Sequence, residues 1–320
     1  MSSHLGDQKL VSRLASEHPD NVIPAFGPSS AQLRSLNQLN QSIAGLHPWW
    51  SHHISVEDIT TASPSVTSQK QVHYASLFPG YFDNLDLEPA ASALFESLPS
   101  PTRFTTFVEK TLRPYLLSYP NAVLGEVGLD RSFRIPAAKE DPKSARSHLG
   151  DEVVHKKLTH LKTPIEHQLQ LLTKQLELAF ELDRNVSMHS VQAQGATVDL
   201  LFSLSNDGKW IGSKSKICMH SYGGSADTIA RILRIHPKRL YFSFSTTINA
   251  RLSRLEALIR AVPDDRLLLE SDYNDVRTSE IRLWEILGIV CDAKGWHKEG
   301  AALRLKENWR TFSGYYELAA

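Results

Sequence analysis

The chain contains the stretch AVLGEVGLD at residues 122–130, and the rest of the sequence is organised around it. Residues 122–124 form an apolar run that predicts a buried strand, and Gly125 and Gly128 bracket Glu126 at its end. A carboxylate in that place is costly unless a cation meets it. Two interpretations are open. Glu126 either pairs with a nearby arginine in a tight turn, or it binds a metal ion.

Three later apolar runs also end in side chains that bind metals. Residues 186–189 end in His189, residues 217–220 end in His220, and residues 267–272 end in two carboxylates. Imidazole and carboxylate groups are common ligands of divalent metals. The four strand ends therefore favour a metal site, with the ligands Glu126, His189, His220 and Asp272.

The second half of the chain alternates strand and helix patterns at a spacing of roughly 25–30 residues, as repeated βα units do. Thr163 and Ser225 are placed to cap two of the helices. In barrels built from such units the chemistry lies at the carboxyl ends of the strands. The pattern predicts the α/β class, with residues 1–320 forming one (β/α)8 barrel of the TIM type.

The first half is less regular. Residues 21–27 predict a strand, and LHPWW at 46–50 is followed by two more histidines, which indicates either a cleft wall or a packed aromatic corner. We expect insertions at 28–45, 54–80 and 136–162. Residues 54–80 are expected to form a surface loop, and residues 136–162 a charged loop that faces the substrate. Its histidines are expected to be solvated: His148, His155 and His160.

The composition narrows the class of protein. The 320 residues include 35 basic and 35 acidic side chains, so the net charge is zero and nucleic-acid binding would need a local basic patch. The two cysteines do not suggest a disulfide framework and favour the cytoplasm or the nucleus. We find no apolar run long enough to span a membrane and expect no membrane partner.

In these motifs the sequence resembles the TatD family of metal-dependent hydrolases, also described as TatD-type deoxyribonucleases. The matching residues are GEVGLD at 125–130, SMHS at 187–190, MHSYGG at 219–224, ESD at 270–272 and Asn308. HPWW at 47–50 is similar to the fungal branch. The resemblance covers most of residues 8–315.

The resemblance implies a barrel that binds one or two divalent ions (Mg, Mn or Zn) and hydrolyses phosphodiesters of DNA. Glu126 would bridge two ions, His189 and His220 would bind one, and Asp272 would bind the other and accept a proton from the attacking water, which makes Glu126 and Asp272 the catalytic residues. Glu270, with Ser271, would hold Asp272, and His47 and Tyr222 would lie near the substrate.

One departure from the family is clear. Family members begin with a strand ending in His-x-His, and no such pair precedes residue 21. We therefore expect that the sequence lacks its first strand, that it represents an incomplete gene model, and that two-metal catalysis is impaired. The alternatives are a non-catalytic interaction scaffold with a protein partner, and amidohydrolase-type chemistry on a small molecule.

Overall fold

The computed structural model describes residues 25–26, 45–56, 66–83, 85, 88–138, 157–206, 208–273 and 276–314. Within these residues a parallel sheet runs in the order β1-β4-β5-β6-β7-β8. The sequential order of parallel strands is that of repeated βα units. The strands are β1 (Ala25–Phe26), β4 (Val123–Asp130), β5 (Val186–Val191), β6 (Ile217–Met219), β7 (Leu240–Phe244) and β8 (Leu267–Leu269).

Two glycines let β4 and β5 approach each other closely. A Cβ atom on Gly125 would lie 2.7 Å from the Cβ of Ser187, and one on Gly128 would collide with the carbonyl oxygen of His189. The register between the two strands shifts between Leu124 and Val127. Such an irregularity re-aims a side chain locally, and here it falls on Glu126.

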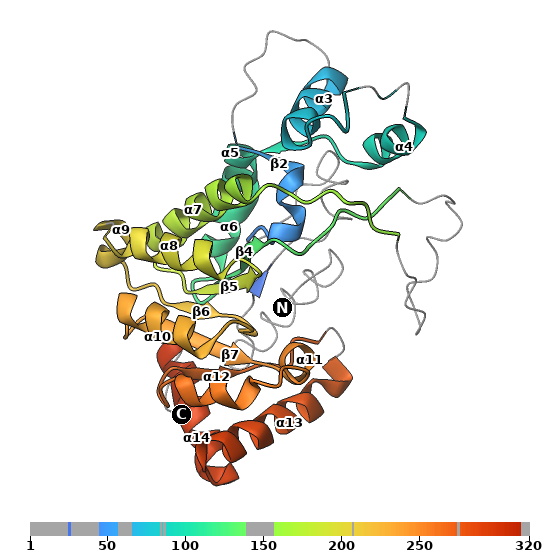
Figure 1. Cartoon of the computed structure of the whole chain (residues 1–320). Coiled ribbons are helices and arrows are strands. Elements are labelled where there is room, and N and C mark those ends of the chain that lie inside the picture. Colours follow the sequence, from blue (N-terminus) through green and yellow to red (C-terminus); the bar gives the residue numbers. More distant parts are fainter. Residues whose placement is uncertain are drawn as a thin grey trace.

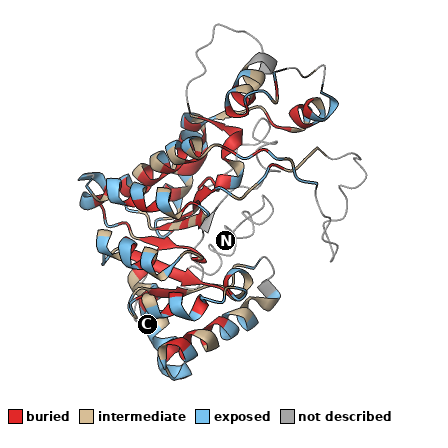
Figure 2. Cartoon of the chain, viewed as in Figure 1, coloured by how far each residue is buried: buried red, intermediate tan, exposed pale blue. Residues whose placement is uncertain are grey.

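Helices cover one side of the sheet (Figure 1). They are α7 (Ile165–Glu181), α8 (Gln194–Ser205), α9 (Gly208–Gly212), α10 (Ala226–Ile235) and α12 (Leu255–Ala261), whereas the short helix α11 (Thr246–Asn249) follows the carboxyl end of β7. Ser225 caps α10 as predicted, because its hydroxyl accepts a hydrogen bond from the Thr228 amide at 3.1 Å. The predicted cap of α7 was wrong: Pro164 holds the N-cap position and makes no side-chain capping bond. Figure 2 shows the strands as a buried layer behind the exposed helix surfaces.

The last two helices, α13 (Val276–Lys294) and α14 (Lys298–Ser313), follow β8. Phe312 of α14 packs with one residue from each of four strands: Val123, Cys218, Tyr241 and Leu268. Asn308 donates hydrogen bonds to the carbonyls of Asp264 at 2.7 Å and Leu267 at 2.9 Å. Asn185, just before β5, donates to the Phe312 carbonyl at 2.7 Å. Helix α14 therefore closes the amino ends of the strands and leaves the carboxyl ends for the site.

The first half contains more helix than predicted. Where we expected a surface loop over residues 54–80, the structure has helix α3, and its Tyr74 is fully buried. Aromatic residues explain the difference, because Tyr74, Phe82 and Phe95 form a second core with Ile135 and Leu161. The elements are η1 (Pro48–His53, a 3-10 helix), β2 (Ile54–Ser55), α3 (Val66–Leu77), α4 (Pro89–Ser97), β3 (Thr102–Arg103), α5 (Phe104–Phe107), η2 (Val108–Leu112, a π-helix) and α6 (Arg113–Ser118).

Several predictions concern residues outside the described part. These are the missing first strand before residue 21, most of the insertion at 28–45, and the stretch 139–156 with His148 and His155. His160, which is described, is exposed as expected. Among the described helices none is both long and apolar enough to cross a bilayer.

Buried histidines support η1, the segment that follows His47. His52 and His53 are almost fully buried, so this part of the motif is a packed corner. His73 of α3 donates from Nε2 to the His52 carbonyl at 2.9 Å, and His167 of α7 lies 2.9 Å from the Ser51 carbonyl. Burial lowers the pKa of His52 to about 3 and that of His73 to about 4.

These low pKa values predict that acid destabilises the fold. The unfolded chain takes up protons near pH 6.5 while folded His73 stays neutral to about pH 4, so stability is lost as pH falls between these values. At pH 5 the loss from His73 is about 2 kcal/mol. Urea unfolding at pH 7.5 and 5.0 should show a smaller acid loss in His73→Gln than in the wild type, whereas the exposed control His160→Gln should match the wild type. An unchanged acid loss in His73→Gln would contradict the assignment.

Candidate metal centre

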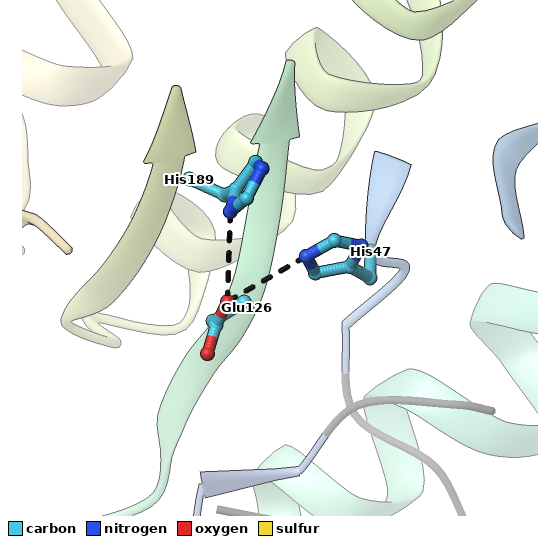
Figure 3. A group of neighbouring side chains, drawn as sticks. All are labelled: His47, Glu126 and His189. Carbon is cyan, nitrogen blue, oxygen red and sulfur yellow. Dashed lines mark ion pairs between the residues drawn. The ribbon is translucent and has the colours of Figure 1, made fainter. Parts of the chain in front are cut away.

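Glu126 lies among three histidines at the carboxyl end of the sheet. Its Oε2 is 3.5 Å from Nε2 of His47 and 3.7 Å from Nδ1 of His189, and its Oε1 is 3.3 Å from Nε2 of His220. Figure 3 shows His47 and His189 approaching Glu126 from a different segment each, with His189 on the neighbouring strand. Nε2 of His220 is also 3.2 Å from Oδ2 of Asp272.

These atoms fall into two groups that share Glu126. One group is His47, Glu126 and His189, and the other is Glu126, His220 and Asp272; within each group the ligand atoms lie within 4.8 Å of one another. Two ligands bound tetrahedrally to one ion at about 2.1 Å would themselves be about 3.4 Å apart. Two separations in each group, from 3.2 to 3.7 Å, lie close to that value. The residues present therefore fit a divalent metal.

His189 is oriented by Asp130, the last residue of β4. Nε2 of His189 lies 3.2 Å from Oδ2 of Asp130, which leaves Nδ1 on the side of Glu126. Asp130 is itself held by the indole N–H of Trp49 at 2.6 Å and by the amide and hydroxyl of Ser132, each at 2.6 Å. A carboxylate behind a histidine fixes the tautomer and the ring of a metal ligand.

His220 has an equivalent support. Its Nδ1 lies 2.6 Å from Oε2 of Glu270, so its Nε2 is left for Glu126 and Asp272. Oε1 of Glu270 accepts hydrogen bonds from the Ser243 hydroxyl at 2.6 Å and the Ser221 amide at 2.7 Å. The Ser221 hydroxyl donates to Asp272 at 3.0 Å, or to Glu270 at the same distance.

The electrostatics of the cluster result from burying acids with imidazoles. Burial acts to raise the pKa of Glu126, but His220, His189 and His47 outweigh it and hold the pKa well below its ordinary value. Burial acts to lower the pKa of His220, but Glu270, Glu126 and Asp272 outweigh it and hold the pKa well above 6.5. The pKa of His189 is likewise raised, because Asp130 and Glu126 outweigh burial. Without a metal the cluster holds protons that a cation would displace.

The structure brings the four residues predicted as ligands to one place, and it alters the expected neighbours. His220 groups with Asp272 rather than with His189. Glu270 was expected to hold Asp272 but contacts His220, and the two carboxylates meet only through Ser221. Tyr222 was expected near the substrate, but it is 2% exposed and packs edge-on against Phe242. A substrate contact of Tyr222 stays a prediction.

Sequence reasoning also missed functional neighbours. His47, assigned to the substrate, stands among the candidate ligands. Asp130 and Trp49 were both in the quoted motifs but received no role. For Asp130 the sequence did offer a signal. It ends the motif that carries Glu126, and functional side chains gather at the carboxyl ends of parallel strands. Nothing in the sequence indicated that Trp49 would donate to it.

Comparison with known proteins decides the family. The family model described as TatD related DNase matches residues 3–314. The chain belongs to the TatD family. This confirms the resemblance carried by the four motifs and places the chain in a family of metal-dependent hydrolases.

Two fungal relatives and one solved structure are similar to the chain. The chain is 32% identical to the Cut9-interacting protein scn1 of Schizosaccharomyces pombe, over 98% of this chain and 90% of that protein. It is 28% identical to the uncharacterized deoxyribonuclease YMR262W of Saccharomyces cerevisiae, over 84% of this chain and 80% of that protein. A solved structure of an uncharacterized amidohydrolase from Saccharomyces cerevisiae aligns with a TM-score of 0.53 and 14% identity, over 96% of this chain and 84% of the other. The fold is the predicted α/β, TIM-type barrel.

The support of His220 by Glu270 can be tested without metal. We predict that Glu270→Gln lowers the pKa of His220, because it removes one of the charges that raise it. The measurement is a proton NMR titration of the histidine rings in chelator-treated protein. Glu256→Gln, an exposed change on α12, should leave the titration of His220 as in the wild type. An unchanged pKa in Glu270→Gln would show that Glu270 does not hold the proton.

Proposed function

We propose that this TatD protein is a divalent-metal-dependent hydrolase that cleaves phosphodiester bonds of DNA or a related substrate. The observation that carries the proposal is Glu126, one partly buried carboxylate whose two oxygens face two separate groups of candidate ligands. A shared carboxylate between two ligand groups suits phosphodiester hydrolysis, in which the attacking and leaving oxygens both need stabilising. The name of the relative YMR262W, a deoxyribonuclease, supports the same substrate class.

Each residue would have a defined task. His47, His189 and Glu126 would hold one ion, and Glu126, His220 and Asp272 would hold the other. Bound divalent ions lower the pKa of water and neutralise charge on phosphoryl oxygens. Asp272 would accept the proton of the attacking water, since its carboxylate is partly exposed while His220 is buried. Asp130 and Glu270 would hold the two histidines in position.

The ligand set supports Zn, Mn or Mg, because mixed imidazole and carboxylate ligands suit all three. One ion or two would satisfy the residues present.

Both cysteines are free thiols in buried positions, which agrees with a reducing cytoplasm or nucleus.

A second candidate is a non-catalytic interaction role on the same barrel. The observation that favours it is the name of the relative scn1, a Cut9-interacting protein, at 32% identity. In that case the metal centre would serve stability, and a protein partner would bind elsewhere. Metal binding without turnover of phosphodiester, amide or lactone substrates would support this candidate. Turnover of an amide or lactone alone would favour small-molecule chemistry.

Glu126→Gln tests the proposed activity. We expect the wild type to cleave a short DNA oligonucleotide with Mg²⁺ or Mn²⁺, and Glu126→Gln to lose at least about 100-fold in rate, more than substitution of an outer-shell group costs. The reason is that the neutral amide weakens both ligand groups at once. Glu256→Gln is the matched control and should keep the wild-type rate. Equal rates in Glu126→Gln and wild type would refute the assignment.

A further inference from the structure

A partly exposed aromatic pair, Trp49 and Phe133, lies beside the candidate metal centre. The ribbon that carries Phe133 also carries the exposed residues Arg131, Arg134 and Lys157, and we call these five residues the lip. We propose that the lip binds the nucleotides next to the scissile phosphate, with a base stacked on the Trp49–Phe133 pair and neighbouring phosphates on the basic side chains. This inference rests on the proposed function and names how the same site holds its substrate.

Trp49 is ordered and yet exposed. Its ring stacks on Phe133 with centroids 5.0 Å apart and planes at 12°, and it meets the edge of His47 at 4.7 Å. Its indole N–H is held by Asp130. Despite these contacts 39% of its surface remains exposed. An indole fixed at one edge and open to solvent is suited to stacking a planar ring.

Trp49 also lies close to the proposed chemistry. Its ring centroid is 6.2 Å from that of His189, a candidate ligand. A base stacked on Trp49 would therefore place an adjoining phosphate near Glu126. The same tryptophan orients Asp130, and through it His189. Trp49 would therefore both contact the substrate and help to position a candidate metal ligand.

The basic side chains belong to a ribbon that leaves the end of β4. Residues 135–137 and 157–161 run antiparallel, with Pro136 bridged to Leu158. The Ile135 amide donates to the Leu161 carbonyl at 2.9 Å, and the Ala137 amide donates to the Lys157 carbonyl at 2.8 Å. Arg131, Arg134 and Lys157 are exposed. In Figure 1 the ribbon extends away from the sheet, next to the part that contains α3 and α4.

The ribbon is anchored, which gives its charges a fixed place. Ile135 and Leu161 are buried in the second core with Tyr74 and Phe82. Helices α3 and α4 therefore pack against the ribbon. Because burying these apolar side chains fixes the ribbon, the cost of ordering it is met before a ligand binds.

The charged residues of the ribbon are all basic. Residues 131–138 and 157–162 contain Arg131, Arg134, Lys157 and Lys162 and not one acidic residue. Within the described residues no ion pair joins these four to a carboxylate. The chain as a whole is neutral, so this is the kind of local patch that phosphate binding requires. Cations beside an exposed aromatic pair match a nucleic-acid strand, whose phosphates and bases alternate.

Binding without metal tests the lip separately from catalysis. The probe is a fluorescein-labelled twelve-nucleotide oligothymidylate, and its anisotropy is measured in EDTA at several salt concentrations. The triple variant Arg131→Ala, Arg134→Ala and Lys157→Ala should bind at least tenfold more weakly, with a salt slope reduced by about two, since each phosphate contact to a single strand contributes about 0.7. The matched control, Lys214→Ala, Arg234→Ala and Lys238→Ala, removes three exposed charges beside the amino ends of β6 and β7 and should stay within about threefold of wild type.

The aromatic half of the lip has its own comparison. Trp49→Ala should weaken binding by about fivefold to one hundredfold, the range for losing one stacked base, whereas Trp49→Phe keeps a ring and should retain most of the affinity. An oligonucleotide with abasic positions should bind the wild type weakly and show no further loss with Trp49→Ala. Circular dichroism checks that each variant is folded. If Trp49→Ala does not fold, the triple variant, whose substitutions are all at exposed positions, tests the lip on its own.

The outcomes separate the two proposals. Wild-type affinity in the triple variant, or in a folded Trp49→Ala variant, would overturn the lip. So would the absence of oligonucleotide binding by a wild-type protein that cleaves DNA when metal is added. Binding that depends on the lip, together with no turnover in any metal, would uphold the lip and count against the proposed hydrolase.

Discussion

The charge of Glu126, whose side chain is only 14% exposed, is the constraint on which the site depends. The sequence predicted Glu126 at the end of its strand, but it lies within β4. A carboxylate there needs positive partners, and three histidines from different segments supply them. The close approach of β4 and β5, which only glycine permits at Gly125 and Gly128, brings His189 within reach. Helix α14 closes the other end of the strands, so the charge and its partners gather at the open end.

The histidines around Glu126 are controlled by a second ring of groups. Asp130 takes one nitrogen of His189 and Glu270 takes one nitrogen of His220, so each imidazole offers its other nitrogen to the centre. In metal centres, carboxylates behind the histidine ligands fix their tautomers and ring positions in the same way. Trp49 connects the ring to the surface, because it holds Asp130 and remains exposed beside Phe133. Trp49 therefore links the position of the candidate ligand His189 to the proposed contact with the substrate.

Periodicity and strand ends were enough to predict the barrel and the convergence of four candidate ligands. Alternating βα units, the barrel class and the convergence of Glu126, His189, His220 and Asp272 all come from short-range patterns and the rule for parallel strands. Other features depend on contacts between distant residues. Tyr74 and Phe82 turn a polar-looking segment into a helix against Ile135, and Trp49 reaches Asp130 across 81 positions. Thr163 lost its capping role because Pro164 occupies the N-cap, which local sequence did not distinguish.

The central claim is that both ligand groups share Glu126, and a metal titration tests it most directly. Chelator-treated protein would be titrated with Mn²⁺ and the bound metal counted by electron paramagnetic resonance. His47→Gln should weaken only one group and Asp272→Asn only the other, so each keeps metal binding at the intact group. Glu126→Gln should weaken binding at every site that the wild type fills. Wild-type affinity and stoichiometry in Glu126→Gln, with the protein folded, would contradict the account.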